Sequence, residues 1–432
     1  MKLPFSSLAL ALSALVASAQ VPDNLVVEGV PAITPELRHD VARYLEFRAS
    51  AFHGWHPIRR EMLITTRFAE TPQLHLVKSP GGARKQITFG TEPVGGGKFR
   101  PKAGDYIIYS QDSGGGEFYQ LYRLDLQDGR TTLLTDGKSR TTGARQSHSG
   151  VYAAYTSTRR TGKDNDIYVI NPSDPKSDRL LTELSGGGWG VLDWSPDDSL
   201  LLVLQYISIN ESQLHLVDAR TGKRSQLTRT GKDKVAYGHA RFSRDGKAIY
   251  ATSDDDSEFQ QLIRIDLKSG EQQTLTANIS WDVEEFEQSP DGKVIAFVTN
   301  EAGVGILNLM DAKSGKALPK PRLPLGTVSN LEWHANGYDL AFNLSSAKSP
   351  LDVYSYDVRT GLLERWTESE TGGLNPEKFV EPEIIKLSSF DGLLVSAIVY
   401  RPDPKRFPGP RPAILSIHGG PEGQSRPGFQ AR

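Results

Sequence analysis

The sequence has 432 residues, of which 38% are hydrophobic and 24% are charged, proportions typical of a soluble globular protein. Fifty basic and fifty-two acidic side chains leave a formal net charge of −2 without a long run of one sign, which argues against a nucleic-acid or anionic-membrane partner. There is no cysteine, so disulfides and thiolate metal sites are excluded. The length suits a large repeat domain or two to three compact domains.

The first residues have the features of a secretory signal. Lys2 precedes an apolar stretch from Leu8 to Val16, and Ala17-Ser18-Ala19 forms an A-x-A cleavage site. The apolar stretch is far shorter than the ~20 residues that span a bilayer. We therefore expect cleavage after Ala19 and a periplasmic or secreted protein that is not attached to a membrane. An uncleaved anchor or a buried N-terminal helix is the alternative.

The segment of residues 20–50 contains one short amphipathic pattern. Thr34-Pro35 supplies a helix cap and a first-turn proline. Apolar residues then follow at helical spacing: Leu37, Val41, Tyr44 and Leu45. We predict a single short helix here.

A short strand-like motif then recurs seven times. The copies are QLHLV at Gln73, QLYRLD at Gln120, DIYVIN at Asp166, QLHLVD at Gln213, QLIRID at Gln261, GILNLMD at Gly305 and DVYSYD at Asp352. The second residue of each copy is apolar: Leu74, Leu121, Ile167, Leu214, Leu262, Ile306 and Val353. The steps between these residues are 47, 46, 47, 48, 44 and 47. A period of this length indicates a repeat architecture.

Two other features keep the same period. A tight-turn motif appears as SPDD at Ser195, SRDG at Ser243, SPDG at Ser289 and HANG at His334, and its Asp-Gly or Asn-Gly pairs suit hairpin turns. Most units end in an apolar residue and a threonine: Ile87-Thr88, Leu134-Thr135, Leu181-Thr182, Leu227-Thr228, Leu275-Thr276 and Trp366-Thr367. The sixth unit, around Leu318, lacks this ending.

Each unit accordingly predicts four short strands separated by turns. Segments such as Val294–Val298 are apolar on both faces, so a four-stranded sheet of this kind needs neighbours to cover it. Radial stacking of such sheets covers both faces and protects most edges. We predict an all-β fold, a seven-bladed β-propeller over residues 51–368. A β-solenoid or a row of sandwiches is the alternative, disfavoured because solenoid repeats are usually shorter.

The pattern changes after the propeller, in residues 369–432. Thr371-Gly372-Gly373 predicts a linker, and two strands from Glu383 are joined by a hairpin turn at Phe390-Asp391-Gly392. A Pro-rich loop follows. Ala413–Ile417 then predicts a third, apolar strand that runs directly into His418-Gly419-Gly420-Pro421.

This order of features resembles the prolyl oligopeptidase family of serine peptidases. A seven-bladed propeller, a hairpin with a DG turn ending in YRP, and a strand leading into HGGP are most similar to its bacterial dipeptidyl and acylaminoacyl peptidase branches. The architecture is similar over nearly the whole mature chain, whereas the match of motifs is confined to the last ~45 residues. In the family, the strand that leads into the HGGP turn belongs to an α/β-hydrolase domain.

The resemblance implies an oxyanion hole at the HGGP turn. Gly419 and Gly420 would donate backbone N–H groups to the developing negative charge, and His418 stands where some relatives carry a tyrosine. Donors must lie about 3 Å from the oxyanion, and the two glycines have no side chain to obstruct its approach. A plain loop after a strand, without a chemical role, is the alternative.

The catalytic groups that the family uses are absent from the sequence. No G-x-S-x-G motif occurs in the 432 residues, and all nine histidines lie at or before His418. In the family the nucleophile, acid and base follow later in the hydrolase domain. We therefore expect a C-terminally truncated hydrolase domain, no catalytic residue within this segment, and no peptidase activity of the segment alone.

One further candidate site lies in the sixth unit. Some dipeptidyl peptidases of the family bind the substrate's amino group with a glutamate pair from the propeller, and Glu284-Glu285 is such a pair. Alternation along a strand would direct the two side chains to opposite sides, which weakens this assignment.

The leading hypothesis is a serine peptidase that cleaves short peptides by acyl transfer, with the propeller as a substrate filter and without a metal or other cofactor. The rival hypothesis is a periplasmic propeller that binds proteins or peptides and has no catalytic activity, because one fold hosts many functions. Cleavage-site preference and oligomeric state do not follow from the sequence.

Overall fold

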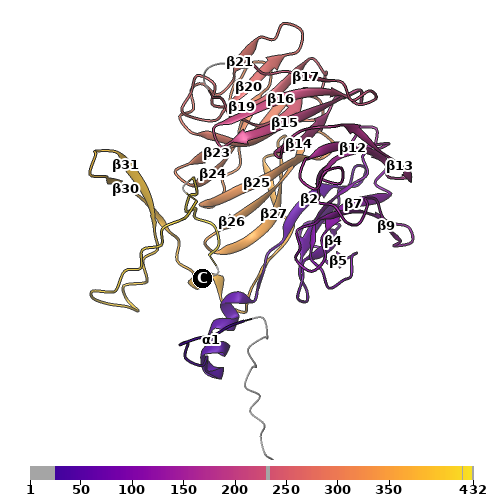
Figure 1. Ribbon diagram of the computed structural model, residues 1–432. Helices are drawn as coiled ribbons and strands as arrows, with labels where there is room; N and C mark the ends of the chain where they lie inside the picture. The colour runs from indigo at the N-terminus through magenta and orange to yellow at the C-terminus, as the bar shows by residue number, and fades with distance from the viewer. Residues whose placement is uncertain (1–24, 230–233, 421, 431–432) are drawn as a thin grey trace, which may run out of the picture. The chain divides into compact units, whose positions relative to one another are not determined.

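The computed structural model describes residues 25–229, 234–420 and 422–430 (Figure 1). The described residues divide into two compact units, one that ends at Ala42 and one that begins at Arg43. The predicted signal segment and its cleavage site at Ala19 lie outside the described residues. None of the helices in the described ranges is long and apolar enough to cross a membrane.

The predicted N-terminal helix is confirmed as α1 (Pro35–Leu45). It begins where expected, because the Leu37 N–H donates to the Thr34 hydroxyl at 3.2 Å and the Arg38 N–H donates to the Thr34 carbonyl at 3.0 Å. None of its residues is buried.

The second unit contains seven small antiparallel sheets, each formed by strands that are consecutive in sequence (Figure 1). Blade 1 comprises β2 (Ala51–Trp55), β3 (Met62–Thr66), β4 (Gln73–Val77) and β5 (Arg84–Gln86); blade 2, β6 (Val94–Phe99), β7 (Tyr106–Gln111), β8 (Gln120–Asp125) and β9 (Thr131–Leu133); blade 3, β10 (Thr141–Gln146), β11 (Ala153–Ser157), β12 (Asp166–Asn171) and β13 (Asp174–Thr182); blade 4, β14 (Trp189–Trp194), β15 (Leu200–Ser208), β16 (Glu211–Asp218) and β17 (Arg224–Gln226).

The remaining three blades continue this order. Blade 5 comprises β18 (Tyr237–Phe242), β19 (Ala248–Ser253), β20 (Gln261–Asp266) and β21 (Gln272–Thr274); blade 6, β22 (Asp282–Gln288), β23 (Val294–Glu301) and β24 (Val304–Asp311); blade 7, β25 (Gly326–Trp333), β26 (Asp339–Ser346), β27 (Ser349–Asp357) and β28 (Leu362–Arg365).

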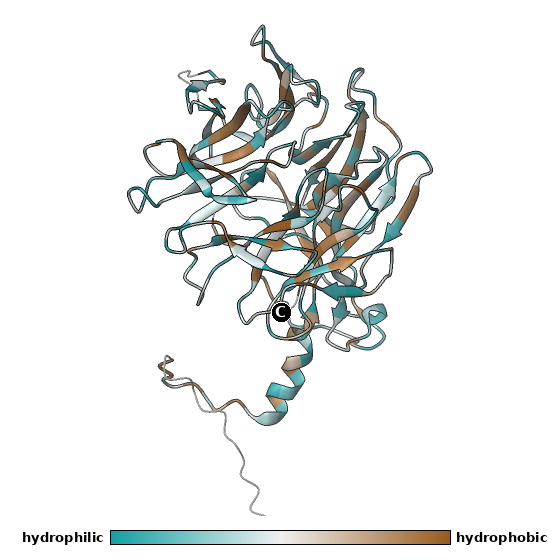
Figure 2. Cartoon of the chain, turned by 90° about the vertical axis from the view of Figure 1, so that its right-hand side faces the viewer, coloured by the Kyte–Doolittle hydropathy of each residue, from teal (hydrophilic) through white to brown (hydrophobic). Residues whose placement is uncertain are grey.

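The sheets close into a ring, which confirms the predicted seven-bladed β-propeller. The first strand of blade 1, β2, contacts both β6 of blade 2 and β25 of blade 7. Apolar clusters fill the spaces between neighbouring sheets, and Figure 2 shows the hydrophobic segments along the strands and hydrophilic ones in the turns. The apolar faces seen in the sequence are therefore covered by adjacent blades.

The apolar–threonine ending of the repeat is a hydrogen-bonded clip between the third and fourth strands. In blade 5, the Leu275 N–H donates to the Leu262 carbonyl at 2.8 Å, and the Leu262 N–H donates to the Thr276 hydroxyl at 2.9 Å. Blades 1, 2, 4 and 7 contain the same pair of bonds. In these five blades, the N–H and the C=O of one third-strand residue, Leu262 in blade 5, therefore both have hydrogen-bond partners in the segment of the fourth strand.

The sixth copy of the repeat is displaced by one residue from its predicted alignment. Thr252, nine residues after Ser243, pairs with Leu262, and Val298, nine residues after Ser289, pairs with Leu307. Leu307 is therefore the counterpart of Leu262, and choosing Ile306 was wrong. The motif GILNLMD holds apolar residues at both positions, so the sequence could not distinguish them.

Blade 1 and blade 7 meet at a seam that no strand crosses. Apolar side chains from both blades form one buried cluster: Phe52, Trp55, Met62, Ile64, Val77, Ala341, Val353 and Trp366. The Phe52 N–H donates to the Asn343 side chain at 2.9 Å, and the Trp55 indole N–H donates to the Glu332 carbonyl at 3.1 Å.

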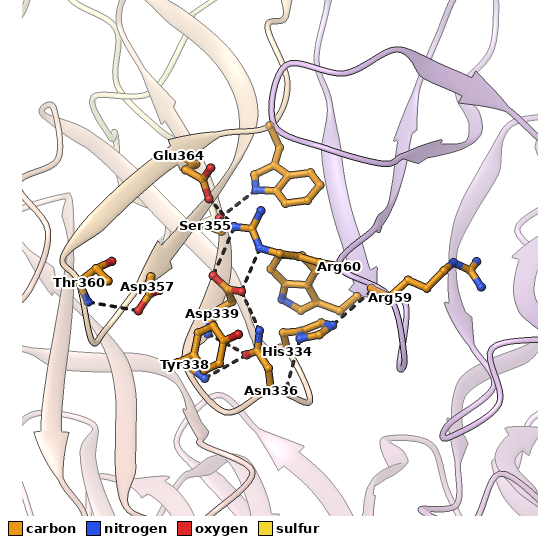
Figure 3. Close-up of polar contacts among 12 residues, drawn as sticks. Arg59, Arg60, His334, Asn336, Tyr338, Asp339, Ser355, Asp357, Thr360 and Glu364 are labelled. Carbon is orange, nitrogen blue, oxygen red and sulfur yellow. Dashed lines mark hydrogen bonds and ion pairs between the residues drawn. The ribbon is translucent and has the colours of Figure 1, made fainter.

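Arg60 of blade 1 is the central polar group of this seam. Figure 3 shows its guanidinium reaching Asp339, Ser355 and Glu364 of blade 7, with Nε 3.0 Å from Asp339 Oδ2. The guanidinium also lies 5.0 Å from the centre of the Trp366 ring. The Asp339 side chain is only 3% exposed, so Arg60 neutralises a nearly buried charge.

A two-stranded ribbon joins the two ends of the propeller. Strand β1 (Phe47–Arg48) pairs with β29 (Glu370–Thr371), and Arg84 of blade 1 forms an ion pair with Glu370. Gly372 follows with φ 65°, and a Cβ there would lie 1.8 Å from the Arg43 carbonyl oxygen. This close approach of two backbones requires glycine at position 372.

The predicted hairpin after the propeller is confirmed, but the predicted third strand is not. A short 3-10 helix, η1 (Pro376–Lys378), precedes strands β30 (Glu383–Ser388) and β31 (Leu394–Val399), which pair around a turn in which Gly392 has φ 87°. Residues 413–417 form no strand and are exposed, with Ile414 at 96%. An isolated apolar stretch cannot form a strand without a partner, and in the described ranges the β30–β31 hairpin offers it none.

We expect the Arg60→Ala variant to lose about 1–3 kcal/mol of unfolding free energy, because Asp339 would lose its charge partner while remaining nearly buried. Urea denaturation at neutral pH measures this loss. Arg59→Ala is the matched control, since Arg59 is 52% exposed and pairs only with its neighbour Glu61, so its loss should stay below about 0.5–1 kcal/mol. Equal losses in the two variants would contradict the role given to Arg60.

Candidate functional site

Charged side chains gather where the first strands of the blades meet around the propeller axis. In every blade the penultimate residue of the first strand occupies an equivalent position: Gly54, Lys98, Arg145, Asp193, Arg241, Glu287 and Glu332. These seven residues, here called the axial ring, comprise three basic residues, three acidic residues and one glycine. Their formal charges sum to zero.

An ion pair in the axial ring passes over blade 1. Lys98 of blade 2 pairs with Glu332 of blade 7, although these blades are not neighbours. Gly54 lies beneath the pair, and a Cβ at this position would be 3.1 Å from Glu332 Oε1 and 3.5 Å from Lys98 Cδ. The absence of a side chain at Gly54 therefore leaves room for the pair, and Glu332 also accepts the Trp55 N–H at 2.8 Å.

Arginines dominate the opposite side of the axial ring. Arg241 Nε lies 3.3 Å from Glu287 Oε1, and Arg241 and Arg145 both donate to the Leu192 carbonyl at 3.1 Å. Burial and the nearby Arg241 lower the pKa of Arg145 to about 10, so its guanidinium still carries its charge at neutral pH. Burial also raises the pKa of Asp193.

A polar cavity of about 160 Å³ lies beside these groups. It is lined by Asp193, Arg241, Phe242, Arg244, Glu287 and Gln288. Cation and anion side chains both face it, so the inner end of blades 4 to 6 is polar.

The two candidate glutamates on β22 have different environments. A register shift lies between Val283 and Glu285, and Glu285 accepts the N–H groups of Asn330 at 3.1 Å and Leu331 at 3.3 Å from blade 7. Burial, with smaller contributions from Glu287 and Glu284, raises the pKa of Glu285 to about 7. Glu284 instead forms an ion pair with Arg426, with 2.6 Å between Arg426 Nη1 and Glu284 Oε1. The structure does not bring the two carboxylates together on one ligand site.

The segment after the HGGP motif lies on blades 6 and 7. Arg426 Nε donates to the Gly303 carbonyl at 2.9 Å, and the Asn300 side chain donates to Gln424 at 2.7 Å. The Phe429 N–H donates to the Ser345 hydroxyl at 3.0 Å, and the Phe429 ring contacts the rings of Phe47 and Phe379. Sequence reasoning missed Arg426, because nothing in the pattern connects it with Glu284, 142 residues earlier.

The predicted oxyanion-hole residues lie at the surface. His418, Gly419 and Gly420 are exposed, and Gly420 has φ 95°, a conformation that glycine permits. His418 Nδ1 lies 3.2 Å from the Gly419 carbonyl oxygen. Among the described residues no hydrogen bond or ion pair joins this motif to Glu284 or Glu285, so its role stays a prediction. Within the same ranges no group of three or more His, Asp or Glu side chains is arranged to hold a metal ion.

We expect the pH dependence of stability to reveal the buried Glu285. The folded state binds its proton more tightly than the unfolded chain, so the unfolding free energy should fall between pH 4.5 and 7 and the loss should be complete above pH 7. Glu285→Gln keeps an acceptor oxygen without the titration. The difference in unfolding free energy between this variant and the parent chain should therefore be about 1–3 kcal/mol more favourable to the variant at pH 8 than at pH 5.

Urea denaturation at pH 5 and pH 8 measures this gain. Glu284→Gln is the matched control on the neighbouring residue, which pairs with Arg426 and should show no gain at pH 8. If Glu285→Gln and the parent chain have parallel pH profiles, the assigned environment of Glu285 is wrong.

Comparison with known proteins identifies the family of the propeller. The sequence model of the prolyl oligopeptidase N-terminal β-propeller domain matches residues 91–369. The uncharacterized peptidase YuxL of Bacillus subtilis (strain 168) is 28% identical over 180 residues, which cover 42% of this chain and 25% of YuxL.

Solved structures share the fold at low sequence identity. Puromycin hydrolase has a TM-score of 0.74 and 17% identity, with 93% of this chain and 66% of that chain covered. A prolyl endopeptidase has a TM-score of 0.68 and 17% identity, with coverage of 83% and 56%. Prolyl oligopeptidase B of Galerina marginata has a TM-score of 0.67 and 13% identity, with coverage of 84% and 55%.

The matches thus span a quarter of the curated relative and between 55% and 66% of the three structures. The family model covers more than half of the chain and six of the seven blades. The chain therefore belongs to the prolyl oligopeptidase family and carries that family's N-terminal β-propeller.

Proposed function

We propose that this chain is the propeller-bearing part of an exported serine-type peptidase that cleaves short peptides by acyl transfer. The observation that carries the proposal is the family's propeller followed by the β30–β31 hairpin and the HGGP motif, in the order that the family uses. Gly419 and Gly420 would supply oxyanion donors once the remaining strands of a hydrolase sheet order them. The 432-residue segment contains no G-x-S-x-G motif and is proposed to be inactive by itself.

The axial ring supports a filter role for the propeller. The Lys98–Glu332 pair and the Arg241–Glu287 pair bring charged side chains from four blades to the inner ends of the first strands. A folded protein could not pass a ring occupied in this way, whereas a thin, extended peptide could displace single side chains. The propeller would then restrict the substrates to short or unfolded chains.

A binding protein without catalytic activity is the second candidate. The polar cavity of about 160 Å³ beside the axial ring favours it, because charged side chains line this cavity and could hold a peptide without any reaction. The two candidates share the propeller and differ in whether a serine reacts.

A fluorophosphonate probe distinguishes the candidates. We expect the probe to label the native protein, isolated from its host with an antibody against the propeller, in the periplasmic or culture-medium fraction. The recombinant 432-residue chain should remain unlabelled, because it lacks the nucleophile. A native protein that is not labelled would favour the binding protein, and a native protein confined to the cytoplasmic fraction would contradict export.

The filter is tested by opening the axial ring in the native enzyme. Lys98→Ala removes the ion pair over Gly54, so we expect kcat/KM for a peptide of about 30 residues to rise several-fold relative to that for a tetrapeptide. Lys313→Ala is the control, because Lys313 is an exposed residue on the turn after β24. An unchanged ratio of the two kcat/KM values in Lys98→Ala would contradict the filter.

A further inference from the structure

The chain leaves the propeller and returns to it at one place. Residues 380–423, here called the excursion, carry the β30–β31 hairpin and the HGGP motif. The residues that flank the excursion meet in an aromatic cluster, because the Phe429 ring lies 6.0 Å from the Phe379 ring and 5.4 Å from the Phe47 ring of the β1–β29 ribbon. The excursion is therefore attached to the propeller at both of its ends.

The returning segment, residues 424–429, fits closely against blades 6 and 7. A Cβ at Gly428 would lie 3.3 Å from the Ser345 hydroxyl oxygen. Near the other end of the segment, Gly303 has φ 92°, and a Cβ there would lie 3.1 Å from the Ser425 carbonyl oxygen. Both contacts leave little room for a side chain, so the segment and the two blades have complementary surfaces.

Arg426 makes the charged contact of this segment. Its Nη1 lies 2.6 Å from Glu284 Oε1, and its Nε donates to the Gly303 carbonyl at 2.9 Å. The next residue, Pro427, is buried. Arg426 Nη2 is also buried and has no acceptor among the described residues. The guanidinium therefore depends on Glu284 for its charge partner, and loss of that carboxylate would leave a partly buried cation unpaired.

This contact limits where the HGGP turn can lie. Gln424 accepts a hydrogen bond from the Asn300 side chain at 2.7 Å, so the segment is already held at this residue. Gly420 precedes Gln424 by four residues, which span at most about 14 Å. Glu284 lies on β22, the first strand of blade 6. The glycines of the turn are therefore confined to the surroundings of blade 6.

We propose that Arg426 is a positioning residue for the peptidase reaction. Its ion pair with Glu284 fixes the segment after the HGGP turn on blade 6. This contact holds the backbone donors of Gly419 and Gly420 in place. The inference rests on the proposed peptidase function and deepens it. It also assigns Glu284 to Arg426 rather than to the amino group of a substrate.

Attachment of the segment is measured in the 432-residue chain and needs no activity. The chain has no cysteine, so a fluorophore on Gln430→Cys reports on this segment alone. The slow component of its anisotropy decay reflects tumbling with the whole propeller, and its amplitude should fall at least about two-fold in Arg426→Ala and in Glu284→Gln. Arg406→Ala is the matched control and should leave the amplitude unchanged, because Arg406 is exposed and lies over the ring of its neighbour Phe407.

A conservative variant separates the charge of Arg426 from its shape. Arg426→Lys keeps the cation that pairs with Glu284 but loses the Nε donor to the Gly303 carbonyl. The amplitude of the slow component should therefore lie between those of the parent chain and Arg426→Ala. An amplitude as low as that of Arg426→Ala would contradict the role given to the ion pair.

Positioning is measured in the whole enzyme with a short peptide and with the same peptide after N-acetylation. Arg426→Ala and Glu284→Gln should each lower kcat at least about ten-fold for both peptides and change KM less than about two-fold, because misplaced donors weaken binding of the transition state rather than of the substrate. If Glu284 bound the amino group of the substrate, only the peptide with a free amine would respond, through a higher KM.

Three results would each overturn the proposal. They are an unchanged slow amplitude in Arg426→Ala, an unchanged kcat in both variants of an active enzyme, and a higher KM confined to the peptide with a free amine. An enzyme without any peptidase activity would instead contradict the proposed function. The anisotropy experiment would then still decide whether Arg426 attaches the segment to blade 6.

Discussion

Closure of blade 1 on blade 7 is the contact on which the rest of the propeller depends. Each blade consists of consecutive strands, so no blade strand is shared across the seam. Side-chain packing closes it, together with the β1–β29 ribbon and main-chain bonds such as that from the Ser50 N–H to the Leu351 carbonyl at 2.8 Å. The buried apolar cluster supplies the contact area, and Arg60 neutralises the nearly buried Asp339. The axial ring also depends on this closure, because Lys98 and Glu332 come from blades on either side of blade 1 and meet only in a closed ring.

The repeat explains stability, and departures from the repeat mark the candidate sites. The clip of an apolar residue and a threonine satisfies the perimeter of five blades in the same way. Blade 6 lacks the clip, and among the described residues Leu307 has none of the bonds that Leu262 makes in blade 5. At the axis, Gly54 interrupts a position that is charged in the six other blades and so admits an ion pair. Glu285 is a third departure from the repeat, because its buried carboxylate accepts two main-chain N–H groups of blade 7.

Local patterns in the sequence predicted the local features well. The seven blades, the Thr34 cap of α1 and the turn at Gly392 follow from spacing, capping and turn chemistry, which act over a few residues. Blade 1 is a clear case, because it precedes the region matched by the family model yet follows from the repeat. The choice of Ile306 failed because two neighbouring residues fit the same pattern, and only the pairing with β23 separates them.

The features that the sequence did not reveal depend on contacts between distant residues. Arg426 reaches Glu284 across 142 residues, and no local signal predicts that pairing. The pKa of Glu285 depends on its burial and on two N–H groups from blade 7, which only the closed ring brings close. The apolar pattern of residues 413–417 suggested a strand, but a strand also needs a partner, and a pattern cannot show whether one exists.

The propeller closes because blade 1 packs directly on blade 7, without a blade strand shared across the seam. The chain contains no cysteine, so spin labels on cysteines introduced at Ile58 and Arg359 would report only on this seam, and both side chains are largely exposed. Pulsed electron–electron double resonance should give one short, narrow distribution of distances between the two labels, and this distribution should be lost in a single step as urea unfolds the propeller. A broad or long distribution in the absence of urea would show that the seam is open and would contradict closure of blade 1 on blade 7.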